Sequence, residues 1–320
     1  MENDVIIIGG AFAGLSAAIY SARQGMNTLL ITKDIGGQGL LTTDIQNYPG
    51  FNSISGFDLA SKFQEQASLY GVRYVYDEVT NISSDGNLFK IKTFSGEFES
   101  EGLILAFGKT PRDLNVKGEE KLKGLGVSYC SICDGPLYKN KEVAVAGAGD
   151  HALQAALYLS TVASRVYVVQ KGSRISGSEE MISEVKAHEN VVFLTENEIL
   201  EIFGERNVEG LLLKNQKTGA QEKLKTEAVF VEMGYVAKTG FIKDLVNLNA
   251  SGEVIVDQFC ATSHPGIYAC GDVTNIPYKQ AVISAGQGSV AALSCINYIH
   301  KKRGKGSLKS DWKFIDSKKS

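Results

Sequence analysis

The hydrophobic and polar positions of this chain repeat one pattern twice. Residues 5–9 (VIIIG) form a short, continuous apolar run of the kind found in buried parallel strands, and glycines then lead into a helical pattern over residues 14–24. A second apolar run, residues 28–32, predicts the next strand. A strand, a glycine turn, a helix and a second strand form one βαβ unit. The N-terminal part is therefore predicted to be half of a dinucleotide-binding domain.

The same pattern returns in the middle of the chain. Residues 142–147 predict a strand, residues 150–164 a helix, and residues 166–169 the strand that follows it. This second stretch ends near Gly234, and a final helix is predicted over residues 281–300. The βαβ unit is thus predicted to occur a second time.

The segment between the two units has another pattern. Residues 72–98 contain short runs rich in Val, Tyr, Phe and Ile, separated by turn signals such as the Ser-Ser-Asp-Gly at residues 83–86. They predict β-meander or hairpin structure. Residues 103–106 then predict another central strand.

The order of these elements predicts an α/β fold with two Rossmann-like nucleotide-binding domains of the three-layer ββα type, the second inserted in the first. We place a discontinuous first domain at residues 1–113 and 245–320, and the inserted domain at residues 114–244. A chain of 320 residues is long enough for two such cores to fold without disulfide staples.

Composition and charge narrow the class of protein. Hydrophobic residues make up 43% and charged residues 22% of the chain, as in ordinary globular enzymes. The net charge of -3 gives no reason to expect a nucleic-acid or membrane partner, because either would favour a concentrated basic face. The chain contains no apolar run long enough to span a bilayer and enters its first strand directly, so we expect a cytoplasmic protein.

A pair of cysteines, Cys130 and Cys133, stands shortly before the second glycine turn. Two thiols at this spacing can form a disulfide, and a dithiol beside a nucleotide fold suits electron transfer between a cofactor and a disulfide. Asp134 follows directly and is a candidate proton relay for a leaving thiolate, or else a solvated turn residue. A zinc site would need two more ligands, for which Cys260 and His264 are the suggestive residues, and accidental oxidation is the other rival. We expect redox catalysis and no metal.

Both glycine turns have the residue types that hold a pyrophosphate at a helix N-terminus. In the first turn, Gly9, Gly10 and Gly14 are glycines, while Ala11 takes the middle position of the fingerprint. The open alternative is an ordinary strand-to-helix turn.

The second turn repeats the fingerprint with Gly147, Gly149 and Ala152. At the end of the strand that follows, Gln170 stands where a carboxylate would hold a ribose or an arginine a 2′-phosphate. Lys171 and Arg174 could make partial phosphate contacts. The sequence therefore leaves open whether this domain binds NAD(P)H or keeps its shape with little affinity for the cofactor.

Several separated motifs resemble one family. CSICDG at residues 130–135, preceded by GVSY, resembles the low-molecular-weight thioredoxin reductases and their relatives in peroxide-reducing systems, which are pyridine nucleotide-disulfide oxidoreductases of class II. GGQGLLTTDIQNYPG at residues 36–50, ATSHPGIYACGDVT at residues 261–274, and KQAVISAGQG from Lys279 resemble the flavin-binding segments of that family. The resemblance covers about residues 4–300.

The resemblance implies a set of FAD contacts, with Asp272 on the ribityl chain and Gln280 and Ala281 near the flavin ring. Gly37, Gln38 and Asn47 would line the cofactor.

The resemblance also implies the roles of the two cysteines and the partners of the enzyme. Cys133 would face the flavin and Cys130 would exchange with the disulfide of a thioredoxin or glutaredoxin-like protein. The enzyme is expected to be a homodimer whose domains rotate during turnover.

The chain also departs from the family pattern. The usual basic pair for the NADPH 2′-phosphate falls at residues 170–172 and is largely absent, and Ala237 and Lys238 stand where relatives often have Pro-Asn. His264 and Cys270 replace residues of other types and are interpreted as packing residues. The basic tail, residues 301–320, includes Trp312 and is either a solvated end or a segment that covers the flavin or attracts an acidic donor such as ferredoxin.

Three alternatives to an NADPH-dependent thioredoxin reductase stay open. The first keeps the fold but takes electrons from NADH or ferredoxin. The second is a flavin-dependent dithiol oxidase that passes electrons to oxygen. The third is a non-catalytic flavin redox sensor.

Overall fold

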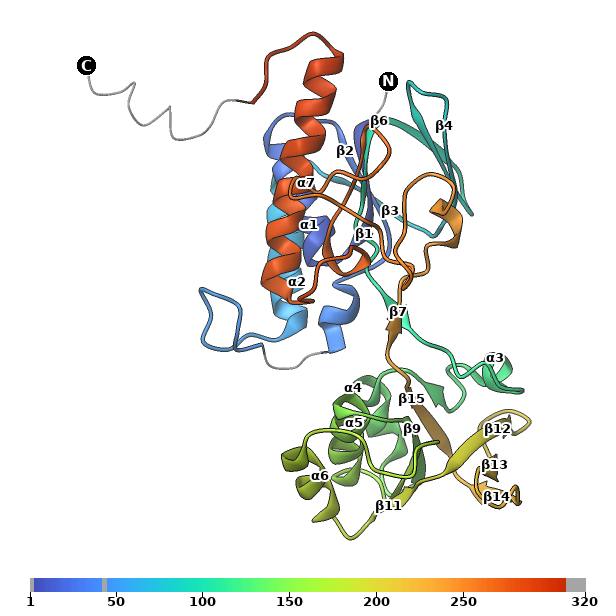
Figure 1. Ribbon diagram of the computed structural model, residues 1–320. Helices are drawn as coiled ribbons and strands as arrows, with labels where there is room; N and C mark the ends of the chain where they lie inside the picture. The colour runs from blue at the N-terminus through green and yellow to red at the C-terminus, as the bar shows by residue number, and fades with distance from the viewer. Residues whose placement is uncertain (1–2, 42–44, 309–320) are drawn as a thin grey trace. The chain divides into compact units, whose positions relative to one another are not determined.

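The computed structural model describes residues 3–41 and 45–308. The chain forms two compact units: unit 1 consists of Met1–Lys109 with Ala237–Ser320, and unit 2 consists of Thr110–Val236 (Figure 1). Unit 2 is therefore an insertion in unit 1.

Unit 1 contains a seven-stranded sheet with the order β3-β2-β1-β6-β5-β4, to which β17 adds by pairing with β6. β1, β2, β3, β6 and β17 pair in parallel, whereas β4, β5 and β6 are antiparallel neighbours. The strands are β1 (Asn3–Gly10), β2 (Thr28–Ile35), β3 (Arg73–Tyr76), β4 (Val79–Ser84), β5 (Phe89–Thr93), β6 (Glu97–Leu105) and β17 (Ile267–Ala269). The helices are α1 (Phe12–Arg23), α2 (Gly56–Leu69) and α7 (Ala281–Lys302), with 3₁₀ turns η1 (Gly37–Leu41), η3 (Gly240–Ile242) and η4 (Gly271–Val273).

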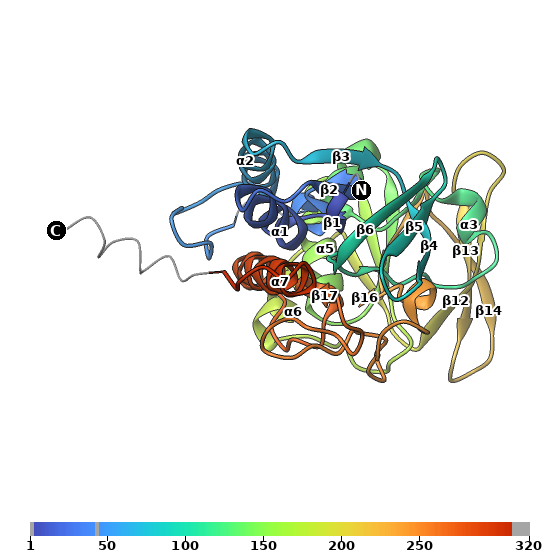
Figure 2. The ribbon, with the colours of Figure 1, turned by 90° about the horizontal axis from the view of Figure 1, so that it is seen from above.

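The continuous apolar run of β1 is explained by burial on both faces. Successive side chains of a strand point to opposite faces, so Val5 and Ile7 pack with α1 and α7, while Ile6 and Ile8 pack with β4, β5 and the segment after Ala237. Figures 1 and 2 show α1, α2 and α7 together on one side of this sheet.

Helices α1 and α7 lie in very close contact. A Cβ atom built on Gly288 of α7 would lie 2.1 Å from the Ala13 carbonyl oxygen of α1, so only a glycine fits there. By length and composition alone α7 could cross a membrane, but its buried residues, including Cys295, Ile296 and Ile299, belong to the core that α1 and the sheet share.

Unit 2 has three layers. A parallel sheet of order β11-β10-β9-β15-β8 is covered on one face by α5 and α6 and on the other by the antiparallel sheet β12-β13-β14. Val143 and Val145 of β9 pack toward the helices, and Ala144 and Ala146 toward the second sheet. The helices are α3 (Glu119–Leu122), α4 (Ser131–Asp134), α5 (Asp150–Ser160) and α6 (Glu179–Lys186), with the 3₁₀ turn η2 (Gly135–Tyr138).

The strands of unit 2 include a two-residue ribbon in which β7 and β16 pair antiparallel, with Val236 opposite Thr110. The first and last residues of the unit are thus neighbours. The strands are β7 (Thr110–Pro111), β8 (Val127–Ser128), β9 (Glu142–Gly147), β10 (Arg165–Val169), β11 (Val191–Leu194), β12 (Asn197–Phe203), β13 (Gly210–Asn215), β14 (Gln221–Lys225), β15 (Ala228–Glu232) and β16 (Tyr235–Val236).

The predicted α/β class with two Rossmann-like domains is confirmed. The interpretation of residues 72–98 as a meander is wrong for β3, which pairs in parallel with β2. The reason is α2, a helix that the sequence analysis did not predict and that provides the crossover between these strands. Its signal was present: the Ser55 hydroxyl accepts a hydrogen bond from the Asp58 N–H and caps the helix.

Candidate active site

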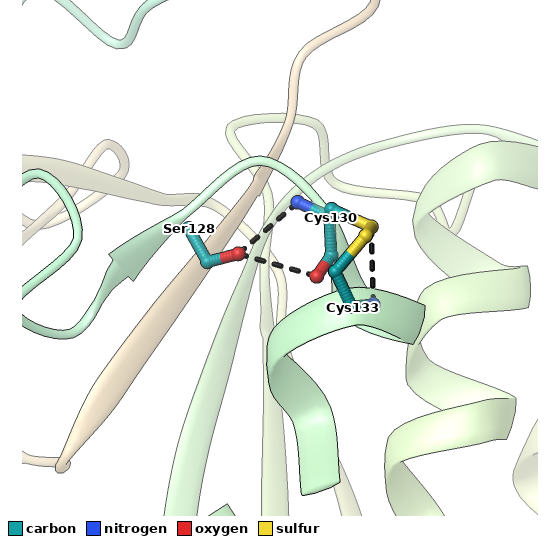
Figure 3. Close-up of a disulfide and its surroundings, with 3 residues drawn as sticks. All are labelled: Ser128, Cys130 and Cys133. Carbon is teal, nitrogen blue, oxygen red and sulfur yellow. Dashed lines mark hydrogen bonds between the residues drawn. A yellow bond between two sulfur atoms is a disulfide. The ribbon is translucent and has the colours of Figure 1, made fainter. Parts of the chain in front are cut away.

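Cys130 and Cys133 are joined in a disulfide at the start of α4 (Figure 3). Cys130 is the N-cap residue of this short helix and half-buried, whereas Cys133 is exposed. The Cys133 N–H donates to Cys130 Sγ at 3.1 Å. A backbone N–H in this position would also stabilise negative charge on Cys130 in the reduced pair.

Ser128, at the end of β8, fixes the backbone of Cys130. The Cys130 N–H donates to Ser128 Oγ at 3.1 Å, and the Ser128 hydroxyl lies 3.2 Å from the Cys130 carbonyl oxygen (Figure 3). Ser128 is buried and Cys130 is half-buried, so both contacts are partly shielded from water. This residue was not among those predicted from the sequence to belong to the site.

Tyr129, directly before Cys130, is held by two carboxylates. Its hydroxyl lies 2.9 Å from Asp113 Oδ1 and 2.7 Å from Glu119 Oε1. Burial raises the pKa of Tyr129 well above its usual range, and both carboxylates raise it further, so the hydroxyl stays a donor. The Lys123 ammonium lies 3.1 Å from Asp113 and over the Tyr129 ring. This network ties the segment before the disulfide to the first residues of unit 2.

Asp134 is the last residue of α4 and partly exposed. Its carboxylate is close enough to Tyr138 to raise the pKa of that phenol, although burial of Tyr138 has the larger effect. The suggested zinc ligands lie elsewhere: Cys260 and His264 belong to unit 1, Cys260 is buried, and the His264 ring packs on Phe89. Within residues 3–41 and 45–308, no group of three or more His, Cys, Asp or Glu side chains could hold a metal.

The first glycine turn, between β1 and α1, is tightly packed. Gly9 has φ +111°, and a Cβ atom there would lie 2.3 Å from the Ala106 carbonyl oxygen. A Cβ atom on Gly14 would lie 1.8 Å from the Gly9 carbonyl oxygen. The N-cap residue Ala11 has no polar side chain and the first turn of α1 has no acidic residue, so this helix end suits an anion.

The structure brings other predicted FAD residues to this end of unit 1. Gly37 lies beside the N-cap of α1, because a Cβ atom there would be 3.3 Å from the Ala11 Cβ. Ala281, the first residue of α7, packs in the same small apolar cluster as Phe12. Asp272, in η4, accepts a hydrogen bond from the Ser284 hydroxyl at 3.2 Å.

Two amide side chains from separated motifs are also in place. Asn47 Nδ2 donates to Gln280 Oε1 at 3.0 Å, across 233 residues of sequence, and Gln280 is the N-cap residue of α7. Gln38 Nε2 donates to the Lys109 carbonyl oxygen at 2.5 Å. The structure thus collects the predicted FAD residues around the first turns of α1 and α7, although their role in binding stays a prediction.

An ion cluster that the sequence analysis missed lies next to these residues. Lys109 Nζ and Lys279 Nζ lie 2.8 Å and 3.2 Å from Glu253 Oε1, and the Glu253 side chain is 14% exposed. Partial burial alone would raise the pKa of Glu253, but hydrogen bonds from Lys109, Asn249 and Lys279 outweigh it and lower the pKa to about 2.

The low pKa of Glu253 leads to a stability prediction. Because the pKa is lower in the folded than in the unfolded chain, ionised Glu253 contributes stability above about pH 4.5, and the contribution is lost as the pH falls toward 2. We expect Glu253→Gln to lower the free energy of unfolding by about 2–3 kcal/mol at pH 7 and by much less at pH 3. Urea unfolding at both pH values measures this.

A surface pair provides the control. Glu97 lies 3.9 Å from Lys92 with its side chain 72% exposed, so Glu97→Gln should change the free energy of unfolding by about 0.5 kcal/mol or less. Equal effects of the two substitutions at pH 7 would contradict the buried cluster.

The second glycine turn connects β9 to α5. Gly147 is packed against β15, because a Cβ atom there would lie 2.2 Å from the Glu232 carbonyl oxygen. Gly149, with φ +84°, is the N-cap residue of α5, and Ala152 is buried in the first turn of that helix. Here the first turn is acidic: Asp150 Oδ1 accepts a hydrogen bond from the Ser178 N–H at 2.7 Å.

Gln170 and Lys171, at the predicted phosphate site, contact other groups of the protein. The buried Gln170 side chain donates to the Arg174 carbonyl oxygen at 2.5 Å. This hydrogen bond is internal to the loop that follows β10. Lys171 Nζ lies 2.6 Å from Glu198 Oε1, so it is paired with a carboxylate of β12. Arg174 is exposed.

The remaining sequence features have structural roles or lie outside the described residues. Cys260, Cys270 and Cys295 are buried free thiols, and burial raises their pKa values. The start of the basic tail is fixed, because the Arg303 guanidinium contacts Glu101 at 2.6 Å and also Asp4. Trp312 lies outside the described residues.

A family model described as pyridine nucleotide-disulphide oxidoreductase matches residues 3–288. The match includes both glycine turns and the cysteine pair. The chain belongs to the pyridine nucleotide-disulphide oxidoreductase family.

Individual relatives of this oxidoreductase cover nearly its full length. The thioredoxin reductase of Treponema pallidum is 36% identical over 300 residues, 93% of this chain and 97% of the relative. The crystal structure of Lactococcus lactis thioredoxin reductase has a TM-score of 0.82 at 34% identity and covers 93% of this chain and 99% of that one. A ferredoxin-flavin thioredoxin reductase from Clostridium acetobutylicum has a TM-score of 0.54 at 30% identity, covering 95% and 99%. The resemblance to thioredoxin reductases is confirmed.

Proposed function

We propose that this oxidoreductase is FAD-dependent and passes two electrons through Cys130 and Cys133 to the disulfide of a thioredoxin or glutaredoxin-like protein. The observation that carries the proposal is the cysteine pair itself, in a chain similar over nearly its whole length to thioredoxin reductases. A disulfide between residues three positions apart closes a very short loop and stabilises the fold little, so its chemistry is the better explanation.

We propose that FAD binds unit 1 at the first turns of α1 and α7. The acid-free N-terminus of α1 and the tight Gly9 and Gly14 turn support pyrophosphate binding there. The Asn47–Gln280 amide pair offers donors and acceptors for a flavin ring edge, and Asp272 offers a carboxylate for ribityl hydroxyls. Bound FAD would supply the two electrons that reduce the enzyme disulfide.

The thiols then carry out the exchange. The Cys130 thiolate, stabilised by the Cys133 N–H, attacks one sulfur of the partner disulfide, which forms a mixed disulfide and releases one partner thiolate. Cys133 next attacks Cys130 Sγ, which restores the enzyme disulfide and releases the second thiolate. The two protons of the enzyme dithiol end on the partner, and the partly exposed Asp134 can transfer one of them.

The electron donor has two candidates. A nicotinamide cofactor would use the turn at Gly147 and Gly149 in unit 2, as the family description suggests. A ferredoxin-like carrier is favoured over NADPH, because the Gln170 side chain bonds within its own loop and Lys171 is paired with Glu198, which leaves little to hold a 2′-phosphate. The similarity to a protein named ferredoxin-flavin thioredoxin reductase supports this second candidate.

An anaerobic experiment tests the function and the donor separately. Enzyme whose flavin has been reduced with dithionite is mixed with oxidised thioredoxin, and we expect the thioredoxin disulfide to be reduced. Reduced flavin that leaves thioredoxin oxidised would contradict the function. Addition of NADPH, NADH or reduced ferredoxin to oxidised enzyme then identifies the donor by loss of flavin absorbance.

The same samples separate the remaining alternatives. A dithiol oxidase would produce peroxide from a dithiol and oxygen, and a redox sensor would be reduced once without sustained turnover. A homodimer and a cytoplasmic location remain predictions from the sequence.

A further inference from the structure

Glu232 places a carboxyl group in the nucleotide crevice of unit 2. In an open parallel sheet, ligands bind outside the carboxyl ends of the strands, at the point where the strand order changes direction. In unit 2 the chain proceeds from β9 to β10 and β11 on one side, while β15 and β8 lie on the other. The crevice therefore opens between the carboxyl ends of β9 and β15.

The last residues of these two strands are direct neighbours. Glu232 of β15 pairs in register with Gly147 of β9, the first glycine of the nucleotide turn. A Cβ atom built on Gly147 would lie 3.2 Å from the Glu232 Cβ, so the Glu232 side chain leaves the sheet directly beside the turn. A dinucleotide held by this turn would bring its pyrophosphate to the same place.

The surroundings of the Glu232 carboxylate are partly buried. The side chain is half-buried, and burial raises the pKa of Glu232 to about 7. About half of the carboxyls are therefore ionised at pH 7 and most of them at pH 8, in surroundings that screen the charge poorly. The nearby Tyr235 also senses this carboxylate, which adds to the effect of burial in raising the Tyr235 pKa. Asp150, in the first turn of α5, adds a second acidic residue to the turn.

We propose that Glu232 is a specificity-determining residue that weakens the binding of pyridine dinucleotides to unit 2 by repelling their phosphates. The effect should be similar for NADPH and NADH, because the pyrophosphate that would lie beside Gly147 is common to both. The inference rests on the proposed function only for its relevance to the electron donor, and it favours a carrier that needs no dinucleotide site.

Calorimetric titration of the FAD-loaded enzyme with NADP⁺ and NAD⁺ tests this inference. Oxidised cofactors bind without reacting, so the result does not depend on thioredoxin reduction. At pH 8, where most Glu232 carboxyls are ionised, we expect Glu232→Gln to increase the affinity for NADP⁺ and for NAD⁺ by up to about tenfold, as removal of one poorly screened like charge implies. At pH 7 the gain should be no more than about twofold, because a half-protonated carboxyl avoids the repulsion by binding a proton.

Matched variants make the result unambiguous. Glu222→Gln, on the exposed surface of β14, should leave both affinities unchanged. Glu232→Ala should reproduce the gain of Glu232→Gln, and flavin absorbance with a thermal unfolding curve establishes that each variant is folded. An unchanged NADP⁺ affinity in both Glu232 variants, or a weaker one, would overturn the proposal, because weaker binding would mean that the carboxylate accepts hydrogen bonds from the ribose.

Discussion

Cys130→Ser is expected to lower thioredoxin turnover by about 1,000-fold or more while FAD binding and flavin reduction are retained. The serine hydroxyl cannot attack a disulfide, and Cys133 alone cannot re-form the enzyme disulfide that completes the cycle. Steady-state reduction of thioredoxin, measured beside flavin absorbance of the same sample, checks both parts. Undiminished turnover would remove the cysteine pair from the mechanism.

Cys133→Ser is the matched variant and separates the roles of the two thiols. Cys133 is the more exposed residue in the disulfide, whereas Cys130 receives the stabilising N–H. If Cys130 exchanges with the partner, Cys133→Ser should accumulate a mixed disulfide with thioredoxin and Cys130→Ser should not. Non-reducing electrophoresis distinguishes them, and trapping by Cys130→Ser alone would reverse the assignment.

Gly288→Ala should cost about 3 kcal/mol or more of stability. The added Cβ would lie 2.1 Å from the Ala13 carbonyl oxygen, and a backbone atom inside two packed helices cannot move aside as a flexible side chain can. Separation of α1 from α7 would also disturb the helix ends where we propose FAD to bind. Chemical unfolding, followed by circular dichroism, measures the loss.

Gly286→Ala, two residues earlier in the same helix, is the control. In the part of the chain that the structure describes, nothing beyond the adjacent backbone of α7 itself lies within 4 Å of a Cβ built there, so the substitution should be neutral or stabilise α7 by about 0.5–1 kcal/mol. A similar loss in both variants would mean that helix packing is not the cause.

The elements of this fold that could be predicted are those whose sequence pattern is continuous over many neighbouring residues. The two βαβ units could be predicted because a buried apolar run, a glycine turn and a helix follow one another within about 30 residues, as in β1 and α1. Helix α2 was missed although Ser55 and Asp58 form a local cap, and that omission made β3 look like part of a meander. The sheet β12-β13-β14 was not predicted either.

The candidate site divides in the same way. The cysteine pair and the glycine turns could be recognised because their residues are close in sequence. Asn47 and Gln280 were each assigned to a flavin-binding motif, but the contact between them was not predicted. The Glu253 cluster and the position of Glu232 beside Gly147 could not be read from the chain. Both depend on pairings between segments that only the folded sheet brings together.

The ribbon of β7 and β16 has a consequence for how such a chain can be built. Because Thr110 and Val236 are hydrogen-bonded neighbours, everything between them leaves and re-enters unit 1 at one point. A whole domain can then take the place of a short surface loop without changing the positions of the strands in unit 1. Exchange of that domain for another with similarly adjacent ends would remove the cysteine pair and leave the architecture of unit 1 as it is.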